Sequence, residues 1–427
     1  MNKIIPNLVL SDSKGNIFVH PDLKMMGCAA DIAKIPLKEE IILMPKGSTL
    51  FYMPGHMPIG YDVNEKYPAL IAQYKGKKVF AVSAFLIPGY TRLLLPAAKK
   101  IDRKIILPLW SYAAVGWLKG KYYVAAIKID PLLRQRPHYY SNTALLKNNA
   151  GLFLKKYPRN RLFRHLSNCA LNYNCRAAQN LFFKRWEAPL PASPVCNASC
   201  LGCLSLQDSD CTTASHARIN FVPTPQEIKE VAVRHLDKAR EAIVSFGQGC
   251  EGEPLLQFKT IKKAIVMIRQ STPKGTIHLN TNAYNPDYLE ELARVGLNSV
   301  RISINSFRKD FYDAYYNQRG YKFNDVMSSI KIAKKAGLFV SLNLLVFPGL
   351  TDTPAEISAL INLLKRGYVD LLQLRNLCID SAFYLSKIPP IKEKPIGILN
   401  MLGTIKKAAP MVCFGYFNLP RERFNLS

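Results

Sequence analysis

Apolar and polar positions follow two different patterns along the chain, and the second half carries the clearer one. There, stripes of apolar residues three and four apart alternate with short strand-like runs. Helices placed between successive strands predict parallel βα units. Six units fit either an open doubly wound sheet or an incomplete barrel. The expected strands are 242–246, 276–281, 299–304, 339–346 and 369–374, with a first strand just before Cys196.

The first 135 residues instead show short apolar or alternating runs separated by turn residues, which predicts a β-rich domain. Residues 79–98 are largely apolar, but Pro88 and Gly89 split them and Arg92 adds a charge. Two buried strands around a turn are therefore expected there, not a membrane span. The expected strands of this domain are 41–44, 50–53, 79–86, 105–115 and 122–129.

Between these halves, residues 142–186 carry apolar residues at helical spacing, and the composition changes near residues 186–189. We expect an α/β protein in which a smaller β-rich N-terminal domain and a helical basic segment precede the βα core. The expected division is a β-rich domain at 1–135, a basic helical segment at 136–187, a core at 188–380 and a C-terminal extension at 381–427.

Several expected core strands carry polar residues on one face, whereas a parallel sheet covered on both faces normally reads as continuous apolar runs. A one-sided antiparallel sheet would explain this alternation, as would a lumen that binds a polar ligand or holds water. Burying these groups unpaired would cost roughly 1–3 kcal/mol each, so we expect something to satisfy them. The polar positions are His278, Asn280, Asn282, Arg301, Ser303, Asn305, Ser341, Asn343, Gln373 and Arg375.

Composition limits the class of protein. With 427 residues, 48% of them hydrophobic, the chain can build buried cores in about three domain-sized units. Ten cysteines are too few for a disulfide scaffold, and the first residues lack the long apolar core of a signal peptide. We therefore expect a soluble, cytoplasmic protein without a membrane partner.

The net charge of +28 favours polyanionic or acidic partners. The excess is concentrated in residues 92–185, which hold 19 basic and two acidic residues. Aromatic residues interleave with the basic ones, as phosphate contacts and base stacking would require. Nucleic-acid binding by this region is one hypothesis, and a solvated basic face is the other. The aromatic residues are Trp110, Trp117, Tyr139, Tyr140, Tyr157 and Phe163.

Cys196, Cys200 and Cys203 place three thiols within eight residues. Such soft thiolate clusters select zinc or iron–sulfur clusters. Zinc would need a fourth ligand, for which Cys211 and His216 lie close in sequence. An iron–sulfur cluster is favoured over zinc and over inert packing, and with three cysteines one iron would keep an open position.

This loop resembles the cysteine loop of the radical S-adenosylmethionine (SAM) superfamily, and the resemblance covers roughly residues 189–375. It implies that Cys196, Cys200 and Cys203 hold a [4Fe-4S] cluster whose fourth iron binds the amino and carboxylate groups of SAM. It also implies reductive cleavage of SAM to methionine and a 5′-deoxyadenosyl radical, which takes a hydrogen atom from a substrate. The family fold is a partial (β/α)6 TIM-like barrel, so the resemblance, not the periodicity, decides between the two sheet architectures.

The resemblance also implies SAM contacts at the C-terminal ends of the strands. Gly252 and Glu253 look like the family motif that receives the SAM amino group. Arg319 lies in a segment where an arginine often precedes a glycine, and would contact SAM or cap the next helix. Two positions depart from the family pattern, since Gly202 replaces an aromatic residue and Ala283 replaces a glycine. The expected SAM-binding residues are Gly252, Glu253, Asn282, Ser303, Asn305, Arg319 and Asn343.

The sequence therefore predicts a radical SAM enzyme with an unidentified substrate, unknown catalytic residues and an external electron donor of the flavodoxin or ferredoxin type. One alternative is an RNA-modifying methyltransferase-like enzyme, in which Cys413 would be the nearest analogue of a methyl-carrying cysteine. Another is a non-catalytic iron–sulfur electron carrier. Cys169 and Cys175 are expected to be structural, or else to act beside the cluster, and Cys378 and Cys413 are isolated.

Overall fold

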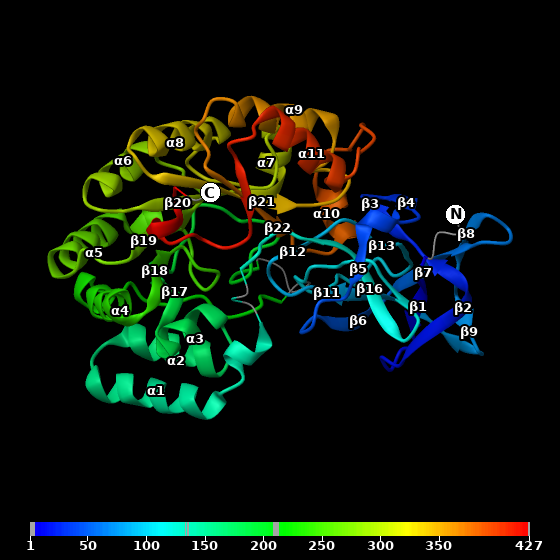
Figure 1. Cartoon of the computed structure of the whole chain (residues 1–427), viewed down its shortest axis with the longest axis horizontal. Helices are drawn as coiled ribbons and strands as arrows, with labels where there is room; N and C mark the ends of the chain where they lie inside the picture. The colour runs from blue at the N-terminus through cyan, green and yellow to red at the C-terminus, as the bar shows by residue number, and fades with distance from the viewer. Residues whose placement is uncertain (1–4, 133, 135, 208–212, 426–427) are drawn as a thin grey trace.

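The computed structural model describes residues 5–132, 134, 136–207 and 213–425. Figure 1 shows a β-rich N-terminal part in blue and cyan beside a larger α/β part in green to red, with the helices of residues 143–183 at the lower edge of the latter. Among the helices of the described residues, none is long and apolar enough to cross a membrane.

A seven-stranded parallel sheet forms the centre of the α/β part, and its strands lie side by side in chain order. Each strand pairs in parallel with the next, as βα units require. The sheet is curled, and helices cover its outer face (Figure 1). Its strands are β17 (Arg185–Pro189), β18 (Arg240–Phe246), β19 (Thr276–Thr281), β20 (Ser299–Ile304), β21 (Phe339–Val346), β22 (Leu371–Asn376) and β23 (Cys413–Gly415).

The helices that follow these strands begin at residues suited to helix starts. Thr224 caps α4 through its hydroxyl, and Asn285 caps α6 through its amide oxygen. Their apolar stripes are buried against the sheet, as the spacing of apolar residues predicts. The helices are α4 (Pro225–Lys238), α5 (Phe258–Ser271), α6 (Pro286–Arg294), α7 (Lys309–Tyr316), α8 (Phe323–Lys335), α9 (Pro354–Leu364), α10 (Ser381–Lys387) and α11 (Ile398–Ala408).

The predicted α/β class, with a partial TIM-like barrel and a β-rich N-terminal region, is confirmed. Two details differ from the expected pattern. The first strand lies at β17, not just before Cys196, because the backbone N–H groups of Ala192 and Ser193 bond to the carboxylate of Glu251 in a neighbouring loop instead of a strand ladder. A seventh strand, β23, comes from the expected C-terminal extension, where its three residues were too short to stand out.

The N-terminal part is built on an eleven-stranded sheet in which every pairing is antiparallel. Smaller sheets of three and two strands flank it. The large sheet holds β1 (Asn7–Ser11), β2 (Ile17–Met25), β5 (Ile41–Leu43), β6 (Thr49–Met53), β7 (His56–Asp62), β8 (Tyr67–Leu70), β11 (Phe80–Phe85), β12 (Tyr90–Arg92), β14 (Ala98–Lys100), β15 (Val115–Leu118) and β16 (Lys121–Lys128). The small sheets hold β3 (Gly27–Ala29), β4 (Ile32–Lys34) and β13 (Leu95–Pro96), and β9 (Gln73–Tyr74) and β10 (Lys77–Lys78).

The strand expected at 105–115 is wrong except for Ala113, which forms an isolated antiparallel bridge with Ala84, and Val115, which begins β15. The preceding residues are partly buried, but their polar backbone groups find other partners. The backbone N–H of Leu107, for example, donates to the carboxylate of Asp380 at 3.0 Å. Apolar residues alone therefore suggested a strand where the chain instead docks onto the α/β part.

Three helices connect the two parts: α1 (Thr143–Lys156), α2 (Arg161–Leu171) and α3 (Arg176–Phe183). They confirm the helices expected from residue spacing at 142–186, although the last residues of that range belong to β17. Asn142 and Asn160 cap α1 and α2 through their side-chain oxygens. The three helices pack on one another and against α4 and β17.

The β-rich part docks onto the sheet at β22, through residues of β12. The hydroxyl of Thr91 donates to the carbonyl of Leu374 at 2.6 Å, and the backbone N–H of Arg92 donates to the side-chain oxygen of Asn376 at 2.8 Å. The guanidinium of Arg92 is fully buried and donates to the carbonyl of Leu377 at 2.8 Å. A buried cation thus satisfies backbone carbonyls across the junction of the two parts.

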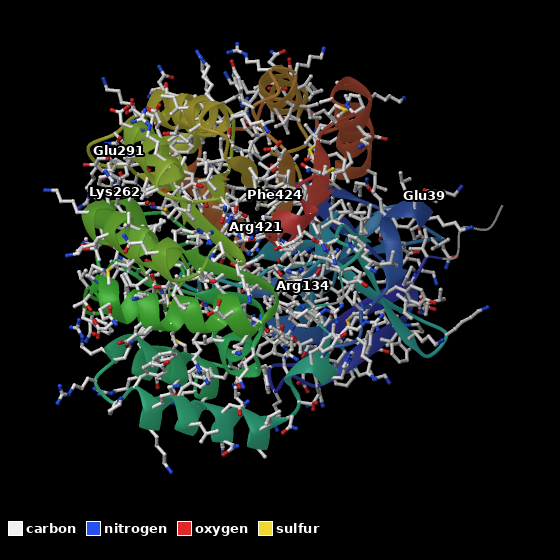
Figure 2. The ribbon with its side chains drawn as sticks, turned by 60° about the vertical axis from the view of Figure 1, so that its left-hand side comes forward. Glu39, Arg134, Lys262, Glu291, Arg421 and Phe424 are labelled. Atoms are coloured by element: carbon white, nitrogen blue, oxygen red, sulfur yellow. The ribbon has the colours of Figure 1, made fainter. Side chains whose placement is uncertain are left out.

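Several basic residues of the 92–185 region bind other parts of the same chain. Arg134 forms an ion pair with Glu241 at 3.0 Å, where the β-rich part meets the α/β part (Figure 2). Arg161 forms another with Glu227, and Arg185 lies over aromatic rings. Phe163 is fully buried, so its expected role as a stacking platform for bases is wrong.

We predict that Arg92→Ala lowers the unfolding free energy by about 3 kcal/mol, because it empties a buried space and leaves carbonyls unpaired. Arg103→Ala, at an exposed position of the same region, is the control and should change it by less than about 0.5 kcal/mol. Urea unfolding followed by circular dichroism measures both. Equal midpoints for the two variants would contradict the role assigned to Arg92.

Candidate functional site

The loop with the three cysteines lies against the end of α7. The backbone N–H groups of Ser199 and Leu201 donate to the carbonyls of Tyr316 and Tyr315, both at 3.0 Å. A second contact follows, as the backbone N–H of Arg319 donates to a carbonyl of the same loop at 2.8 Å. Backbone bonds therefore fix a loop that has no regular secondary structure of its own.

The three thiols lie close enough to influence one another's ionisation. Burial, together with the charge of Glu253, raises the pKa of Cys196 to about 11. Burial also raises the pKa of Cys200, and the charges of Cys196 and Cys203 add to the effect. A cluster of three thiols, of which Cys196 and Cys200 resist ionisation, is a fitting donor set for a metal centre, because a bound cation reverses the cost of ionising them.

Arg218 is a neighbour of the cysteines that the sequence did not single out. Its guanidinium donates to the sulfur of Cys203 at 3.4 Å and to the hydroxyl of Ser205 at 3.1 Å. Arg218 lies 15 residues from Cys203, and no spacing rule connects an arginine to such a loop.

The loop after β18 is held by the buried carboxylate of Glu251, which accepts four backbone N–H groups. Two come from its own loop, from Gly247 at 2.6 Å and Gln248 at 2.8 Å. Two come from the segment after β17, from Ala192 at 2.7 Å and Ser193 at 3.1 Å. Glu251 therefore joins the segment that leads into the cysteine loop to the loop that carries Gly252 and Glu253.

Gly252 allows these two segments to approach closely. Its backbone N–H donates to the carbonyl of Ser193 at 2.7 Å, and the backbone N–H of Glu253 donates to the carbonyl of Val195 at 2.9 Å. A Cβ atom on residue 252 would lie 2.0 Å from the carbonyl oxygen of Val195. Only glycine therefore fits here, which gives the predicted glycine–glutamate motif a steric cause.

The carboxylate of Glu253 reaches the end of β19. It accepts the hydroxyl of Thr281 at 2.5 Å and the backbone N–H groups of Leu255 at 3.0 Å and Asn282 at 2.8 Å. Burial raises the pKa of Glu253 to about 7, although each of these hydrogen bonds lowers it. A carboxylate has about four acceptor positions, so one remains for a donor such as an ammonium group. The amide of Asn282 donates to Asn197 in the cysteine loop at 2.7 Å, which brings that residue to the same place.

The two departures from the family pattern have visible consequences. A side chain at Gly202 would meet the hydroxyl of Tyr315 at 3.0 Å, so α7 supplies the aromatic group beside this position. Ala283 adopts φ of +57°, the left-handed conformation that glycine reaches without strain. The structure thus keeps the backbone geometry of a glycine turn, at a cost of roughly 1–2 kcal/mol.

Asn305 and Asn343 present acceptors without partners. The amide nitrogen of Asn305 donates to the carbonyl of Phe311 at 3.0 Å, and that of Asn343 donates to Ser303 at 3.2 Å. The side-chain oxygens of both asparagines are buried and unpaired. Because unsatisfied buried acceptors are rare, these oxygens suit a ligand with donor groups, such as the ribose hydroxyls of SAM.

Arg319 lies beside the cysteine loop and does not cap a helix. Its side chain is exposed, and its guanidinium donates to the hydroxyl of Ser199 at 3.3 Å. Helix α8 begins after Lys322, whose backbone N–H is bound by Asp325. The helix-capping alternative is therefore wrong, and a contact with SAM stays a prediction.

The polar faces of the strands meet inside the curled sheet, where much of their hydrogen bonding is mutual. Glu187 on β17 accepts the hydroxyl of Ser245 at 2.6 Å and the amide of Asn418 at 2.9 Å. His278 bonds to Ser299 at 2.6 Å and to the side chain next along its own strand face. The one-sided antiparallel alternative is wrong, because these strands pair in parallel and the polar face is internal.

A cavity of about 220 Å³ opens from this polar interior toward α3 and the β-rich part. Four arginines contribute to its lining, whereas Glu187 is the acidic residue among the described lining residues. Burial, with the like charge of Arg375, lowers the pKa of Arg301 to about 9. The buried Nε of Arg301 has no partner among the described residues. The arginines are Arg134, Arg176, Arg301 and Arg375.

The remaining cysteines lie in different parts of the fold. Cys413 pairs with Leu371 at the amino end of β22, which is the opposite end of the sheet from the cysteine loop, so the methyl-carrier analogy fails on geometry. Cys378 follows the carboxyl end of β22, where its carbonyl lies near Gly202. Cys211, a predicted alternative zinc ligand, lies outside the described residues.

Comparison with known proteins finds a family model and relatives that match this region. Residues 190–362 match the family model described as the Radical SAM superfamily. An uncharacterized protein of Methanocaldococcus jannaschii is 31% identical over 172 residues, 38% of this chain and 56% of the relative. The GTP 3′,8-cyclase of Microcystis aeruginosa is 29% identical over 125 residues, 29% of this chain and 38% of the relative. The chain thus covers little more than half of the first relative and less of the second.

Among solved structures, Streptococcus suis SuiB bound to S-adenosylmethionine is 14% identical to this chain. The similarity covers 74% of this chain and 72% of SuiB, with a TM-score of 0.39. The matched region of the family model includes the cysteine loop, the Gly252–Glu253 turn and strands β18 to β21.

We predict that Gly252→Ala destabilises the protein by about 1–3 kcal/mol, because the new Cβ overlaps the carbonyl of Val195. Gly403→Ala is the matched control, since that glycine lies within α11 with open space around its Cβ position. It should raise stability by up to about 1 kcal/mol. Thermal unfolding of the two variants measures opposite shifts, and a neutral Gly252→Ala would contradict the packing described for this loop.

Proposed function

We propose that this chain, which belongs to the radical SAM superfamily through residues 190–362, is an enzyme that cleaves SAM reductively. The observation that carries the proposal is the direct connection between the cysteine loop and the Gly252–Glu253 turn. Val195 bonds to Glu253, and Asn282 bonds to Asn197, so both segments form one site at the carboxyl ends of the strands.

The residues of this site divide between two cofactors. Cys196, Cys200 and Cys203 would hold a [4Fe-4S] cluster, and Glu253 with Asn282 would bind the amino end of SAM. When bound, the cluster supplies the electron that cleaves SAM and yields a 5′-deoxyadenosyl radical. Gly252 keeps the turn close to the cysteine loop. The unpaired oxygens of Asn305 and Asn343, with the hydroxyl of Ser303, would accept donors of the nucleoside, and Arg319 would lie at the rim.

The electron would come from an external donor of the flavodoxin or ferredoxin type. Among the described residues, the cysteines outside the loop do not form a second site with the spacing of the triplet. Exposed basic residues, such as Arg319 beside the loop, would suit the acidic surface of such a donor.

The arginine-lined cavity supports a substrate with an anionic group, a phosphate or a carboxylate. Arginine binds both groups through paired N–H donors, and a site with little water strengthens the attraction. Arg301 and Arg375 come from the strands β20 and β22, and Gln248 of the cavity wall belongs to the loop that carries Glu253. The cavity is therefore continuous with the elements that would hold SAM.

The RNA-modifying alternative rests on the basic region 92–185. Arg92, Arg134 and Arg161 are engaged within the chain, and Phe163 is buried, so this region offers fewer phosphate contacts than its composition suggests. Trp110 remains 41% exposed and available to stack. The cavity favours an anionic small molecule over RNA as the substrate.

We predict that Cys200→Ala abolishes SAM cleavage while the chain stays folded, because the cluster loses one of its three ligands. Cys413→Ala, at the opposite end of the sheet, should cleave SAM like the wild type. The measurement is 5′-deoxyadenosine formed from SAM and dithionite after anaerobic reconstitution, with circular dichroism as the test of folding. Full activity of Cys200→Ala would contradict the ligand assignment, and a reconstituted wild type that forms no 5′-deoxyadenosine would favour an electron carrier.

We further predict that pyrophosphate raises the melting temperature of the wild type by several degrees, since a ligand at 100 times its dissociation constant adds about 2.7 kcal/mol. Arg301→Gln should lose at least about half of this shift, because one of the converging guanidinium groups is gone. Arg366→Gln, at an exposed turn away from the cavity, is the control. An equal shift in all three proteins would place the anion elsewhere.

A further inference from the structure

A second group of sulfur and imidazole side chains lies outside the cysteine triplet. His165 and Cys169 come from one face of α2, and Cys250 comes from the loop after β18. One ligand atom from each residue lies within 4.8 Å of the other two. The Nε2 atom of His165 is 3.5 Å from the sulfur of Cys169. Two residues of one helix and a third residue that is distant in sequence therefore bring their ligand atoms close together.

The spacing fits a single ion. A tetrahedral zinc ion with Zn–S bonds of about 2.3 Å holds its ligand atoms roughly 3.8 Å apart. Among the described residues, no other group of three or more potential metal ligands converges so closely. Cys196, Cys200 and Cys203 do not converge in this way, which suits a cluster in which each sulfur binds a different iron.

The ligands are held in place before any ion binds. Cys169 is 3% exposed and Cys250 is 8% exposed, so neither sulfur moves freely in solvent. His165 and Cys169 are separated by one helical turn, which places both on the same face of α2. The carbonyl of Cys250 accepts the backbone N–H of Ile219 at 2.8 Å, which fixes the loop opposite them.

Two further potential ligands lie near this group, outside the set whose ligand atoms all converge within 4.8 Å. Cys175, just before α3, acts electrostatically on both Cys169 and Cys250. His216 acts on Cys169, and its Nε2 atom would lie 3.4 Å from a Cβ atom on Gly249, the neighbour of Cys250. Structural zinc sites are normally closed by four such ligands.

We propose that His165, Cys169 and Cys250 bind a zinc ion, with the fourth position taken by Cys175 or His216. Both thiols would release their protons when the ion binds, so two thiolates would neutralise its two positive charges. Two thiolates with imidazole form a donor set that selects zinc over hard cations such as magnesium. This zinc site would be independent of SAM cleavage and of the cysteine triplet.

The position of the site gives the ion a structural role. Cys250 directly precedes Glu251, whose carboxylate holds the segment that leads to the cysteine loop. His165 and Cys169 belong to the helical segment on the outside of α4. The ion would thus fasten α2 to the loop that positions Gly252 and Glu253, which otherwise contains no regular secondary structure.

The first test is the metal content of the protein, measured by inductively coupled plasma mass spectrometry. The Cys200→Ala protein is used throughout, so that a missing iron–sulfur cluster cannot affect the result. With zinc in the growth medium, we expect about one zinc ion per chain. Adding His165→Gln, Cys169→Ser or Cys250→Ser should reduce this at least about tenfold, whereas adding Cys28→Ser, in the β-rich part, should leave it unchanged.

A second test uses protein in which the three proposed ligands are intact, so that its result does not depend on whether the ligand variants fold. Cobalt(II) replaces zinc in the Cys200→Ala protein, and two thiolate ligands give a thiolate-to-cobalt absorption band together with visible bands of tetrahedral cobalt. Chelation should also lower the melting temperature of the zinc-loaded protein, because an ion that binds only the folded state stabilises it. It should not affect the protein that also carries Cys169→Ser and Cys250→Ser.

Three results would overturn the proposal. One is a Cys200→Ala protein that takes up less than about a tenth of a zinc ion per chain when zinc is supplied in excess. Another is equal zinc content after Cys169→Ser or Cys250→Ser. The third is a disulfide between Cys169 and Cys250 found by peptide mass spectrometry in protein prepared without oxygen. Because Cys175→Ser and His216→Gln are measured alongside, loss of zinc in one of them identifies the fourth ligand.

Discussion

The site depends on one buried carboxylate. Glu251 accepts N–H groups from the segment after β17 and from the loop after β18, so two chain segments that share no strand ladder are fixed relative to each other. The N–H groups of Ala192 and Ser193 would otherwise be buried without a partner, at a cost of roughly 1–3 kcal/mol each. Once the segments are joined, Gly252 can approach Val195 where no other residue fits, and the cysteine loop comes to lie beside Glu253.

In the interior of the curled sheet, a buried carboxylate is likewise stabilised by the polar groups around it. Burial opposes the ionisation of Glu187, but the charges of His278, Arg301 and Arg375 and the bond from Ser245 outweigh it, so the pKa of its carboxyl lies below its usual value. Glu187 is the acidic residue that faces Arg301 and Arg375 among the described lining residues, since Arg134 is paired with Glu241 outside the cavity lining. Two guanidinium groups beside one carboxylate, in a space next to the strands of the proposed SAM site, give the proposed anionic substrate its physical basis.

The chain's large positive charge has a different meaning in the structure than in the sequence. Arg92 is buried between the β-rich part and β22, and Arg134 and Arg161 form ion pairs across elements. Basic residues thus hold the β-rich part, the helices and the sheet together. Composition records that such residues are present, but only packing decides whether a guanidinium faces a phosphate, a carboxylate or a carbonyl.

Local patterns in the sequence determined the elements and identified the cysteine loop as a candidate metal centre. The strands at 276–281, 299–304 and 339–346 have the expected bounds, because alternation and helical stripes are properties of neighbouring residues. The triplet at Cys196 is equally local. Tertiary structure alone decided the clamp at Glu251, the meeting of Cys169 with Cys250 and the burial of Arg92 against Leu377, 285 residues away. Such contacts form only when separate elements pack together, and no spacing along the chain records which side chains will then face each other.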